Sequence, residues 1–254
     1  MLHFNVLKYL HNLIVTLLLW THYILGFILF FSPFYLLALI FSRNRESAFQ
    51  RLNSLFYRIF FRLVKILIPR VRFDISPDVS AIRSSVILCN HLSYLDPILL
   101  ISIFPGHKTI VKSDLFALPI FGWMLRKSGY LPSLAEGPNV SLVMQQVQEM
   151  KSYLASGGNL FIFPEGTRSR DGRIGAFNKG AFRIARICKA PISVLTIRNT
   201  HRLFQPGRFL FNTTESFKIS VDLAGKLMPD YGNPSFSITK LMVQVRDLME
   251  QPVK

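Results

Sequence analysis

A long apolar segment near the N-terminus is the strongest pattern in the chain. From Leu13 to Phe31 no residue carries a charge, taking His22 as neutral, and most are leucine, isoleucine, phenylalanine or valine. A helix of this length spans roughly 28 Å, close to the thickness of the hydrocarbon core of a bilayer. Pro33 favours a kink or turn, after which the apolar pattern resumes from Phe34 to Phe41. Two geometries fit: one long tilted span, or a helical hairpin in a single leaflet.

A basic stretch with helical periodicity comes next. Between Ala48 and Ile68 apolar residues recur mostly at three- and four-residue steps, which predicts an amphipathic helix. Its polar positions are largely cationic. Such a helix is suited to lying on anionic lipid, although a core-packing helix with a solvated basic face fits the same pattern. The positive-inside rule predicts that this stretch, and everything after it, lies in the cytosol.

From about Val71 the pattern changes to that of a globular α/β domain. Short β-branched or aromatic runs predict strands at Val86–Cys89, Thr109–Val111, Leu160–Phe163, Ile192–Ile197 and Phe217–Val221. Helical patterns occupy Pro97–Phe104, Leu115–Ser128, Val140–Ala155, Lys179–Ile187 and Ser237–Met249. This alternation predicts an α/β fold: a central, largely parallel sheet flanked by helices and preceded by membrane-associated N-terminal helices. We expect anchoring and amphipathic helices over residues 1–70 and the α/β domain over 71–254.

Composition narrows the possible functions. The net charge of +16 favours polyanionic partners, among them nucleic acid, anionic lipid headgroups, and an acidic carrier or phosphorylated cofactor. A soluble nucleic-acid-binding protein has no use for the apolar N-terminal segment, and most of the 23 phenylalanines lie in apolar runs rather than among surface cations. Cys89 and Cys188 form no C-x-x-C pair, so we expect buried free thiols in a reducing compartment.

A histidine and an aspartate follow the first buried strand of the α/β domain. His91 is expected at the strand end, while Asp96, followed by Pro97, resembles a helix N-cap. On one helix a five-residue step separates side chains by about 140°, but across a strand–turn–helix corner the two can meet. Imidazole is the usual general base near neutral pH, and a carboxylate on its other nitrogen fixes the tautomer. The alternative is that Asp96 only caps its helix and His91 is structural.

A second group of polar residues follows the strand that ends near Phe163. It contains one carboxylate, a glycine, two hydroxyls and a guanidinium: Glu165, Gly166, Thr167, Arg168 and Ser169. In α/β folds the carboxyl ends of strands are where ligands bind. A guanidinium is suited to bidentate phosphate binding. A solvated turn with incidental charges is the alternative.

Together these two segments resemble the glycerolipid acyltransferase family, whose best-known members convert 1-acylglycerol-3-phosphate to phosphatidic acid. The family's N-H-x4-D block is similar to Asn90–Asp96, and its F-P-E-G-T-R-S block to Phe163–Ser169. Two weaker blocks also agree: a lysine-containing segment at Val111–Leu115 and a late strand at Ala190–Ile192. The resemblance covers roughly Ile87 to Ile197.

The resemblance implies a role for each matched residue. His91 would be the general base that removes the proton of the acceptor hydroxyl, and Asp96 would orient it. The activated oxygen would attack the thioester directly, without an acyl-enzyme. The matched residues that would bind and position the acceptor's phosphate-bearing headgroup are Glu165, Gly166, Thr167 and Arg168, with Lys112 as a further substrate-binding residue. No metal and no cofactor are expected, and no Cys/His/Asp cluster has metal-ligand spacing.

One family block is incomplete in this chain. The family's second block reads like G-x-I-x-I-D-R and supplies an arginine to the acceptor phosphate, whereas the matching stretch, Gly129–Ala135, contains none. Arg126 and Lys127 lie a few residues earlier. Either they compensate for the missing arginine, or they are solvated cations at a helix end.

The sequence therefore predicts an acyltransferase. It would move a fatty acyl group from acyl-CoA or acyl carrier protein to the free hydroxyl of a lysophospholipid, with 1-acylglycerol-3-phosphate as the best guess. The expected partners are these substrates and membrane lipids, and no nucleic acid. The expected location is a membrane, with the catalytic domain on the cytosolic face (the inner membrane if bacterial). The alternatives are a different lysolipid acceptor, or a non-catalytic lipid-binding module of the same fold.

Overall fold

The strands form one sheet whose central members run parallel. A computed structural model describes residues 2–133, 140–169 and 172–251. The strands are β1 (Val71–Ile75), β2 (Val86–Cys89), β3 (His107–Val111), β4 (Leu131–Pro132), β5 (Asn159–Ile162), β6 (Ile192–Arg198) and β7 (Phe217–Leu227). They lie in the order β1-β7-β6-β2-β5-β3-β4. All neighbours pair in parallel except β6 with β7, so β1 and β7 run opposite to the rest. The predicted α/β class with a largely parallel sheet is confirmed.

Helices cover both faces of this sheet. They are α4 (Pro77–Ser80), α5 (Leu95–Ile103), η2 (Ser113–Ala117), α6 (Pro119–Lys127), α7 (Val140–Ala155), α8 (Lys179–Cys188), α9 (Thr200–Leu203) and α10 (Ile238–Glu250). Helices α8 and α10 contact each other on one side of the sheet, and α5 packs on the other. Along β2, Val86 and Leu88 pack into the cluster under α8 and α10, while Ile87 and Cys89 pack into the opposite cluster. A strand buried on both faces explains its unbroken apolar sequence.

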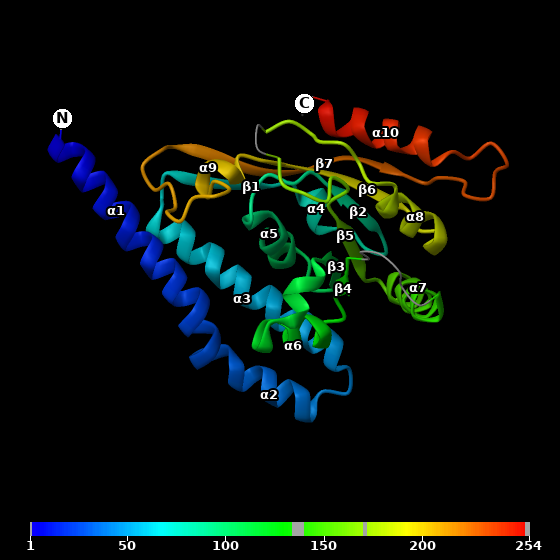
Figure 1. Cartoon of the computed structure of the whole chain (residues 1–254), viewed down its shortest axis with the longest axis horizontal. Helices are drawn as coiled ribbons and strands as arrows, with labels where there is room; N and C mark the ends of the chain where they lie inside the picture. The colour runs from blue at the N-terminus through cyan, green and yellow to red at the C-terminus, as the bar shows by residue number, and fades with distance from the viewer. Residues whose placement is uncertain (1, 134–139, 170–171, 252–254) are drawn as a thin grey trace.

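The N-terminal apolar segment is one continuous helical run, which we call the N-terminal run. It comprises α1 (Leu2–Thr21), a π-helical segment η1 (His22–Phe31) and α2 (Ser32–Phe41). Pro33 causes no turn, because it lies in the first turn of α2, where a missing N–H costs little. The direction of the run does change between α1 and α2 (Figure 1). A π-helical segment beside a proline is a usual cause of such a bend.

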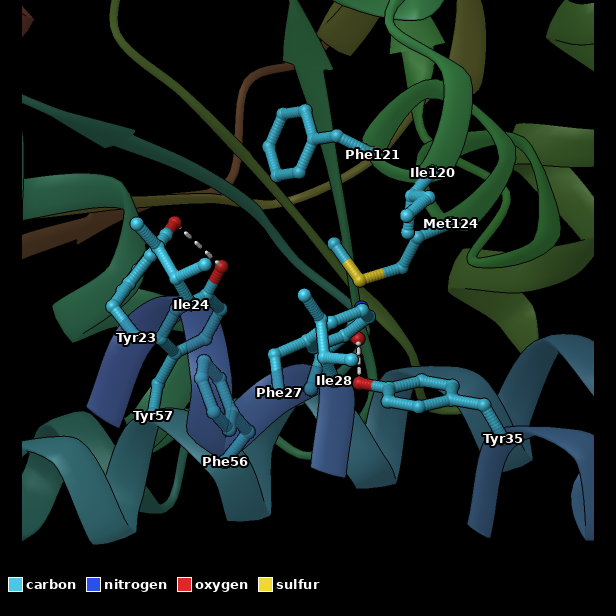
Figure 2. A pocket seen from close by; sticks show the side chains of 11 residues that line it. Tyr23, Ile24, Phe27, Ile28, Tyr35, Phe56, Tyr57, Ile120, Phe121 and Met124 are labelled. Atoms are coloured by element: carbon cyan, nitrogen blue, oxygen red, sulfur yellow. Dashed lines mark hydrogen bonds between the residues drawn. The ribbon is translucent and has the colours of Figure 1, made fainter. Parts of the chain in front are cut away.

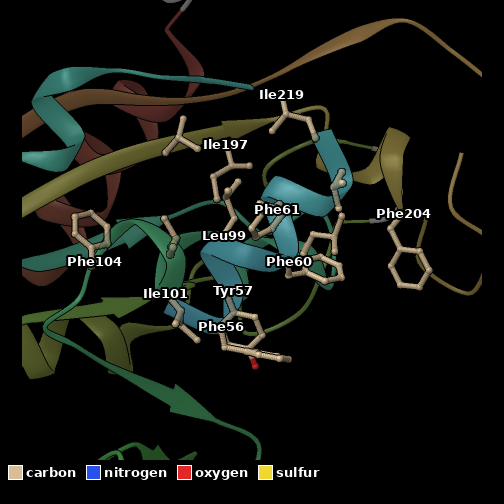
Figure 3. Close-up of a cluster of buried hydrophobic side chains, with 14 of the residues drawn as sticks. Phe56, Tyr57, Phe60, Phe61, Leu99, Ile101, Phe104, Ile197, Phe204 and Ile219 are labelled. Atoms are coloured by element: carbon tan, nitrogen blue, oxygen red, sulfur yellow. The ribbon is translucent and has the colours of Figure 1, made fainter. Parts of the chain in front are cut away.

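The basic periodic stretch forms α3 (Arg45–Leu67), which returns along the N-terminal run. Asn44 caps it, because its side chain accepts a hydrogen bond from the N–H of Ser47 at 2.9 Å. The buried face of α3 packs against α5 and the sheet, and Figure 3 shows Phe60, Leu99 and Ile219 in one apolar cluster. This core continues across the predicted boundary at residue 70. The N-terminal helices are therefore part of the same packed body as the sheet.

A chain of buried polar groups also joins the N-terminal run to the α/β domain. The Tyr35 hydroxyl donates to Asn53 Oδ1 at 2.5 Å, and Asn53 Nδ2 donates to the Tyr130 hydroxyl at 3.2 Å. That hydroxyl also contacts His107 Nε2, whose ring partner Nδ1 lies 2.6 Å from the Phe104 carbonyl. Because each of these polar groups has a hydrogen-bond partner, the series fixes α2 and α3 against β3 without leaving a buried group unpaired.

The stability of the fold is expected to fall in mild acid because of His107. Burial lowers the pKa of this imidazole from 6.5 to about 4, and its bond to the Phe104 carbonyl opposes the shift only in part. Well above pH 6.5 the imidazole is neutral in both the folded and the unfolded state, and the full stability is present. Below pH 6.5 His107 becomes protonated in the unfolded chain, whereas in the folded chain it stays neutral down to about pH 4. The loss across this window is at most about 3 kcal/mol.

Thermal unfolding in detergent, followed across this pH window, measures the effect. His107→Gln removes the titrating group, so the variant should be less stable at neutral pH but lose less of its remaining stability on acidification. Equal pH dependence in the two proteins would show that His107 does not control it.

Candidate active site

The predicted site residues gather where four neighbouring strands end. His91 follows β2, Glu165 and Arg168 follow β5, and Lys112 follows β3. The fourth strand, β6, leads into Thr200 at the start of α9. These strands are adjacent and parallel in the order β6-β2-β5-β3, so their carboxyl ends share one edge of the sheet. This edge is the usual ligand-binding position in an α/β fold.

His91 and Asp96 form the predicted pair. Nδ1 of His91 lies 2.9 Å from Oδ2 of Asp96, the histidine side chain being 15% exposed and the carboxylate fully buried. The imidazole ring stacks on Phe163 with the ring centroids 4.2 Å apart. With Nδ1 engaged by the carboxylate, the proton-accepting nitrogen left for a substrate is Nε2. This is the geometry of an oriented general base.

Asp96 is not the helix N-cap that the sequence suggested. Helix α5 begins at Leu95, with Tyr94 in the N-cap position, so Asp96 lies within the first turn. Its Oδ2 atom accepts hydrogen bonds from the backbone N–H groups of Leu92 at 2.5 Å and Ser93 at 2.7 Å. The carboxylate therefore shapes the loop that carries His91, as well as contacting the ring.

The other oxygen of Asp96 is held by a residue that the sequence did not indicate. The Thr200 hydroxyl donates to Oδ1 of Asp96 at 2.5 Å, and Thr200 is almost fully buried. Asn90 fixes β6, which leads to this threonine, because its side chain bonds both to the carbonyl and to the N–H of Ile197, at 2.9 and 2.7 Å. A buried carboxylate with all its contacts satisfied is a fixed support for His91.

Glu165 links the two motif segments. Its Oε1 accepts a hydrogen bond from the backbone N–H of His91 at 2.9 Å, and its Oε2 accepts one from Gly175 at 2.7 Å. A second link joins the N–H of Ser169 to the carbonyl of His91 at 2.8 Å. Glu165 is only 7% exposed. Because both its oxygens are occupied by backbone donors, Glu165 is placed to position the loops.

Gly166 allows this loop to turn. Its φ of +70° lies in the left-handed region, and a Cβ atom there would approach Nδ2 of Asn178 to 2.8 Å. A side chain at this position would therefore be strained as well as crowded. Asn178 in turn bonds to the Pro164 carbonyl through its N–H at 2.7 Å. The glycine serves the conformation of the loop.

Arg168 contacts the loop that carries the pair. Its guanidinium lies over the ring of Tyr94, 3.4 Å from the centroid, in a cation–π contact. One of its terminal nitrogens, Nη1, is buried without a hydrogen-bond partner among the described residues. Buried donors are rarely left unpaired, so this nitrogen is available to an anion.

The remaining predicted residues lie farther out. Thr167 and Lys112 are exposed, and Lys112 directly follows β3. Arg126, near the end of α6, bonds through Nη1 to the Phe116 carbonyl at 2.6 Å, as expected of a helix-end cation. In the stretch that matches the incomplete family block, Leu134 and Ala135 lie outside the described residues.

The thiol beside the pair is unsuited to nucleophilic chemistry. Cys89 is a free, buried cysteine immediately before Asn90. Burial raises the pKa of its thiol well above 9.0, and the nearby carboxylates of Asp96 and Glu165 raise it further. Cys188 is also free. In the part of the chain that the structure describes, no group of His, Cys, Asp or Glu side chains is arranged to hold a metal ion.

Two apolar cavities lie between the N-terminal run and the α/β domain. One, of about 280 Å³, is bordered by Tyr94 and Leu95 of the motif loop and by Trp20 of the run. The other, of about 170 Å³, lies between the run, α3 and α6, and Figure 2 shows Ile24, Ile28 and Ile120 among its lining residues. The first adjoins the candidate site, whereas none of the predicted catalytic residues lines the second.

Comparison with known proteins assigns the family. The family model described as Acyltransferase matches residues 70–198, half of the chain. The chain belongs to the acyltransferase family. The matched residues include both motif segments, from Asn90 to Asp96 and from Phe163 to Ser169.

Curated acyltransferases show the same relationship. A chloroplastic 1-acyl-sn-glycerol-3-phosphate acyltransferase of Brassica napus is 35% identical over 123 residues, which are 48% of this chain and 35% of the relative. A 1-acyl-sn-glycerol-3-phosphate acyltransferase of Saccharomyces cerevisiae is 29% identical over 160 residues, covering 61% of this chain and 52% of that protein. The chain thus spans about a third to a half of the length of these relatives.

A solved structure shares the fold of this acyltransferase over nearly its whole length. The crystal structure of PlsC from Thermotoga maritima, a 1-acyl-sn-glycerophosphate (LPA) acyltransferase, superposes with a TM-score of 0.71. The superposition covers 95% of each chain at 21% sequence identity. The likeness therefore extends to the N-terminal helices, which lie outside the matched family region.

Proposed function

We propose that this protein transfers a fatty acyl group from a thioester donor to the free hydroxyl of 1-acylglycerol-3-phosphate, giving phosphatidic acid. The observation that carries the proposal is one arrangement. An oriented histidine–aspartate pair lies beside an arginine with an unpaired buried nitrogen, next to an apolar cavity. A phosphorylated lysolipid acceptor requires a base for its hydroxyl, a cation for its phosphate and an apolar space for its acyl chain. The names of the curated relatives support the same acceptor.

In the proposed reaction His91 acts as the general base. Its Nε2 accepts the proton of the acceptor hydroxyl, whose oxygen attacks the thioester carbonyl. Asp96 stabilises the resulting imidazolium through Nδ1. Collapse of the tetrahedral intermediate forms the ester and expels the thiolate, which takes the proton back from His91. No acyl-enzyme is required, which agrees with the neutral, buried thiol of Cys89.

Arg168 is proposed to bind the acceptor phosphate. Its cation–π contact with Tyr94 holds the guanidinium plane while leaving Nη1 free. A guanidinium bonds a phosphate through two parallel N–H groups, which fixes the orientation of the glycerol hydroxyl. Thr167 and Lys112 stay proposals as further headgroup contacts. For Glu165 and Gly166 the contacts described above favour a role in positioning the loop.

The donor is proposed to be acyl-CoA or acyl carrier protein, and no cofactor or metal takes part in the proposed chemistry. Both carriers bear phosphate groups, which suits a chain with a net charge of +16. The cavity beside Tyr94 and Leu95 would receive an acyl chain close to the reacting carbonyl. Nucleic acid is not proposed as a partner.

The N-terminal run is proposed to bind one leaflet of a membrane, with the catalytic domain on the cytosolic face (the inner membrane if bacterial). The helix from Val6 to Phe41 is long and apolar enough to cross a bilayer, and its most apolar 18-residue window has a mean hydropathy of 2.5. Crossing would, however, draw α3 into hydrocarbon, because α3 packs along the run and exposes Arg51, Arg58 and Arg62. An arginine at the bilayer centre costs about 2.5–3.5 kcal/mol or more. A run lying within one leaflet avoids this cost.

An acceptor panel tests the proposed substrate. The purified protein in detergent–lipid micelles would receive acyl-CoA or acyl carrier protein donors and matched acceptors, read by mass spectrometry. We expect 1-acylglycerol-3-phosphate to be acylated fastest and monoacylglycerol, which lacks the phosphate, to react poorly. A higher rate with a lysophospholipid whose phosphate carries a further headgroup would instead indicate a different lysolipid acceptor, as the incomplete second block allows.

A further inference from the structure

The N-terminal run exposes one face and buries the other. Val15, Leu19 and Tyr35 are buried against the protein. Large apolar side chains on the other face are about half exposed or more, among them Leu17, Leu18, Leu25, Leu29, Phe30 and Leu37. No described part of the chain covers this face, and only 22% of the most apolar window is buried. An apolar surface of this extent marks an interaction site.

A loop of the α/β domain is fixed along one flank of the run. Between α9 and β7, the N–H of Phe211 donates to the Thr16 hydroxyl at 2.9 Å, and the Thr213 hydroxyl donates to Asn12 Oδ1 at 2.6 Å. In the same loop Phe209 stacks on Trp20, with the rings nearly parallel and 6.2 Å apart. Phe209 is nevertheless 59% exposed. Its free surface therefore continues the exposed face of α1.

The start of α6 lies against another part of the run. Ile120 lines the same cavity as Ile24 and Ile28, and all three are about half exposed (Figure 2). Leu118, just before α6, is 46% exposed. Exposing two large apolar side chains to water at the start of this helix is unfavourable in free energy. These side chains therefore extend the apolar surface of the run onto the α/β domain.

We propose that the membrane-contact surface of this protein includes both segments: the tip of α6 at Leu118 and Ile120, and the loop at Arg208 and Phe209. A bilayer is the occupant that fits, because the surface is continuous with the run and the exposed Arg208 adjoins its apolar part. Aromatic and basic side chains at the edge of an apolar surface suit the interface between headgroups and acyl chains.

Three contacts fix the tilt of the domain on the membrane, whereas a single helical run would leave it free to rotate about the helix axis. With the tip of α6 and the Phe209 loop both at the interface, the cavities between the run and the domain are held against the lipid. This inference rests on the proposed membrane association of the run.

Site-directed fluorescence labelling tests the inference in the full-length protein. Cys188→Ser leaves the buried Cys89 as the only native thiol. Into this background we would place Ile120→Cys, Phe209→Cys, and Leu29→Cys as the reference on the run. Met228→Cys and Ile187→Cys are controls, because both residues are exposed and apolar but lie after β7 and near the end of α8, away from the run (Figure 1). Each variant carries a polarity-sensitive nitrobenzoxadiazole label.

Vesicles of phosphatidylcholine and phosphatidylglycerol, with or without nitroxide-labelled lipid, provide the readout. We expect labels at positions 29, 120 and 209 to brighten several-fold on vesicles and to be quenched by the nitroxide, and the two control labels not to respond. A response at position 29 alone would overturn the inference and leave membrane association intact. No response at any position would overturn membrane association itself. Brightening at 120 and 209 without vesicles, rising with protein concentration, would assign the surface to a second copy of the chain and also overturn the inference.

Discussion

Replacing His91 by alanine is expected to lower the turnover of acyl transfer by about 10²–10⁴-fold, the usual contribution of a general base. The loss should appear in kcat, because the ring contacts Phe163 and Asp96 rather than the proposed phosphate site. Initial rates of phosphatidic acid formation at saturating acceptor, measured by mass spectrometry, give the result.

Stability measurements separate this effect from misfolding. The His91 side chain is 15% exposed and contacts Asp96 and Phe163, so the alanine variant should unfold at a somewhat lower temperature than the parent but remain folded at the assay temperature. Asp96→Asn should lose stability as well as activity. The carboxylate accepts hydrogen bonds from Leu92, Ser93 and Thr200, and the NH2 group of asparagine, itself a donor, would have to face at least one of them. A folded His91→Ala protein that turns over at a rate close to the parent would contradict the assignment of the base.

Arg168→Ala is expected to lower kcat/KM for the phosphate-bearing acceptor by about 10- to 100-fold, mainly through KM. A hydrogen bond to a charged group contributes about 1.5–3 kcal/mol, which corresponds to this range. Arg168→Lys should recover little, because an ammonium provides neither the planar fork nor the same stacking on Tyr94. The measurement is acceptor-dependent steady-state kinetics at a fixed donor concentration.

Arg183→Ala is the matched control. Arg183 is an exposed arginine on α8, so its loss removes the same charge without touching the site. It should leave the KM of the acceptor unchanged. If Arg168→Ala and Arg183→Ala gave the same KM, Arg168 would not be the phosphate ligand.

The α/β domain could be predicted closely because its strands and helices carry strong local patterns. Val86–Cys89 and Val140–Ala155 were predicted with the observed bounds. Strand β1 was missed because the strands were predicted from continuous β-branched or aromatic runs, whereas in β1 Arg72 and Asp74 alternate with the apolar residues as in a half-buried strand. Strand β4 was missed because it has only two residues. The predicted helix from Leu115 to Ser128 is divided into η2 and α6 at Leu118, where Pro119 disfavours a helical conformation of the preceding residue.

For the N-terminal segment, the length of the apolar helix could be predicted from the sequence, but its packing against α3 and the α/β domain could not. Periodicity cannot tell a helix that lies against its own domain from one that crosses a bilayer, because both expose apolar side chains. The decisive features are contacts over long sequence separations, such as that of Thr16 with Phe211. The run bends at η1 but does not turn back as the predicted hairpin would, and α3 supplies the returning helix.

The site was predictable as far as its motifs extend. His91 and Asp96 could be paired because five residues separate them across a strand–helix corner, and the contact is present at 2.9 Å. Thr200 could not be found, because 104 residues separate it from Asp96 and no local pattern distinguishes it. Tyr94 lies within the first motif, but its stacking with Arg168 depends on the meeting of two strand ends.

The most direct test of the central claim is the fate of the acyl group. Purified protein would be incubated with acyl-CoA carrying a labelled acyl chain and with 1-acylglycerol-3-phosphate, and both lipid products and free CoA would be quantified by mass spectrometry. The account predicts that labelled phosphatidic acid and free CoA appear in equal amounts. Release of CoA with labelled free fatty acid as the main product, or no product either with this donor or with the same acyl chain on acyl carrier protein, would contradict it.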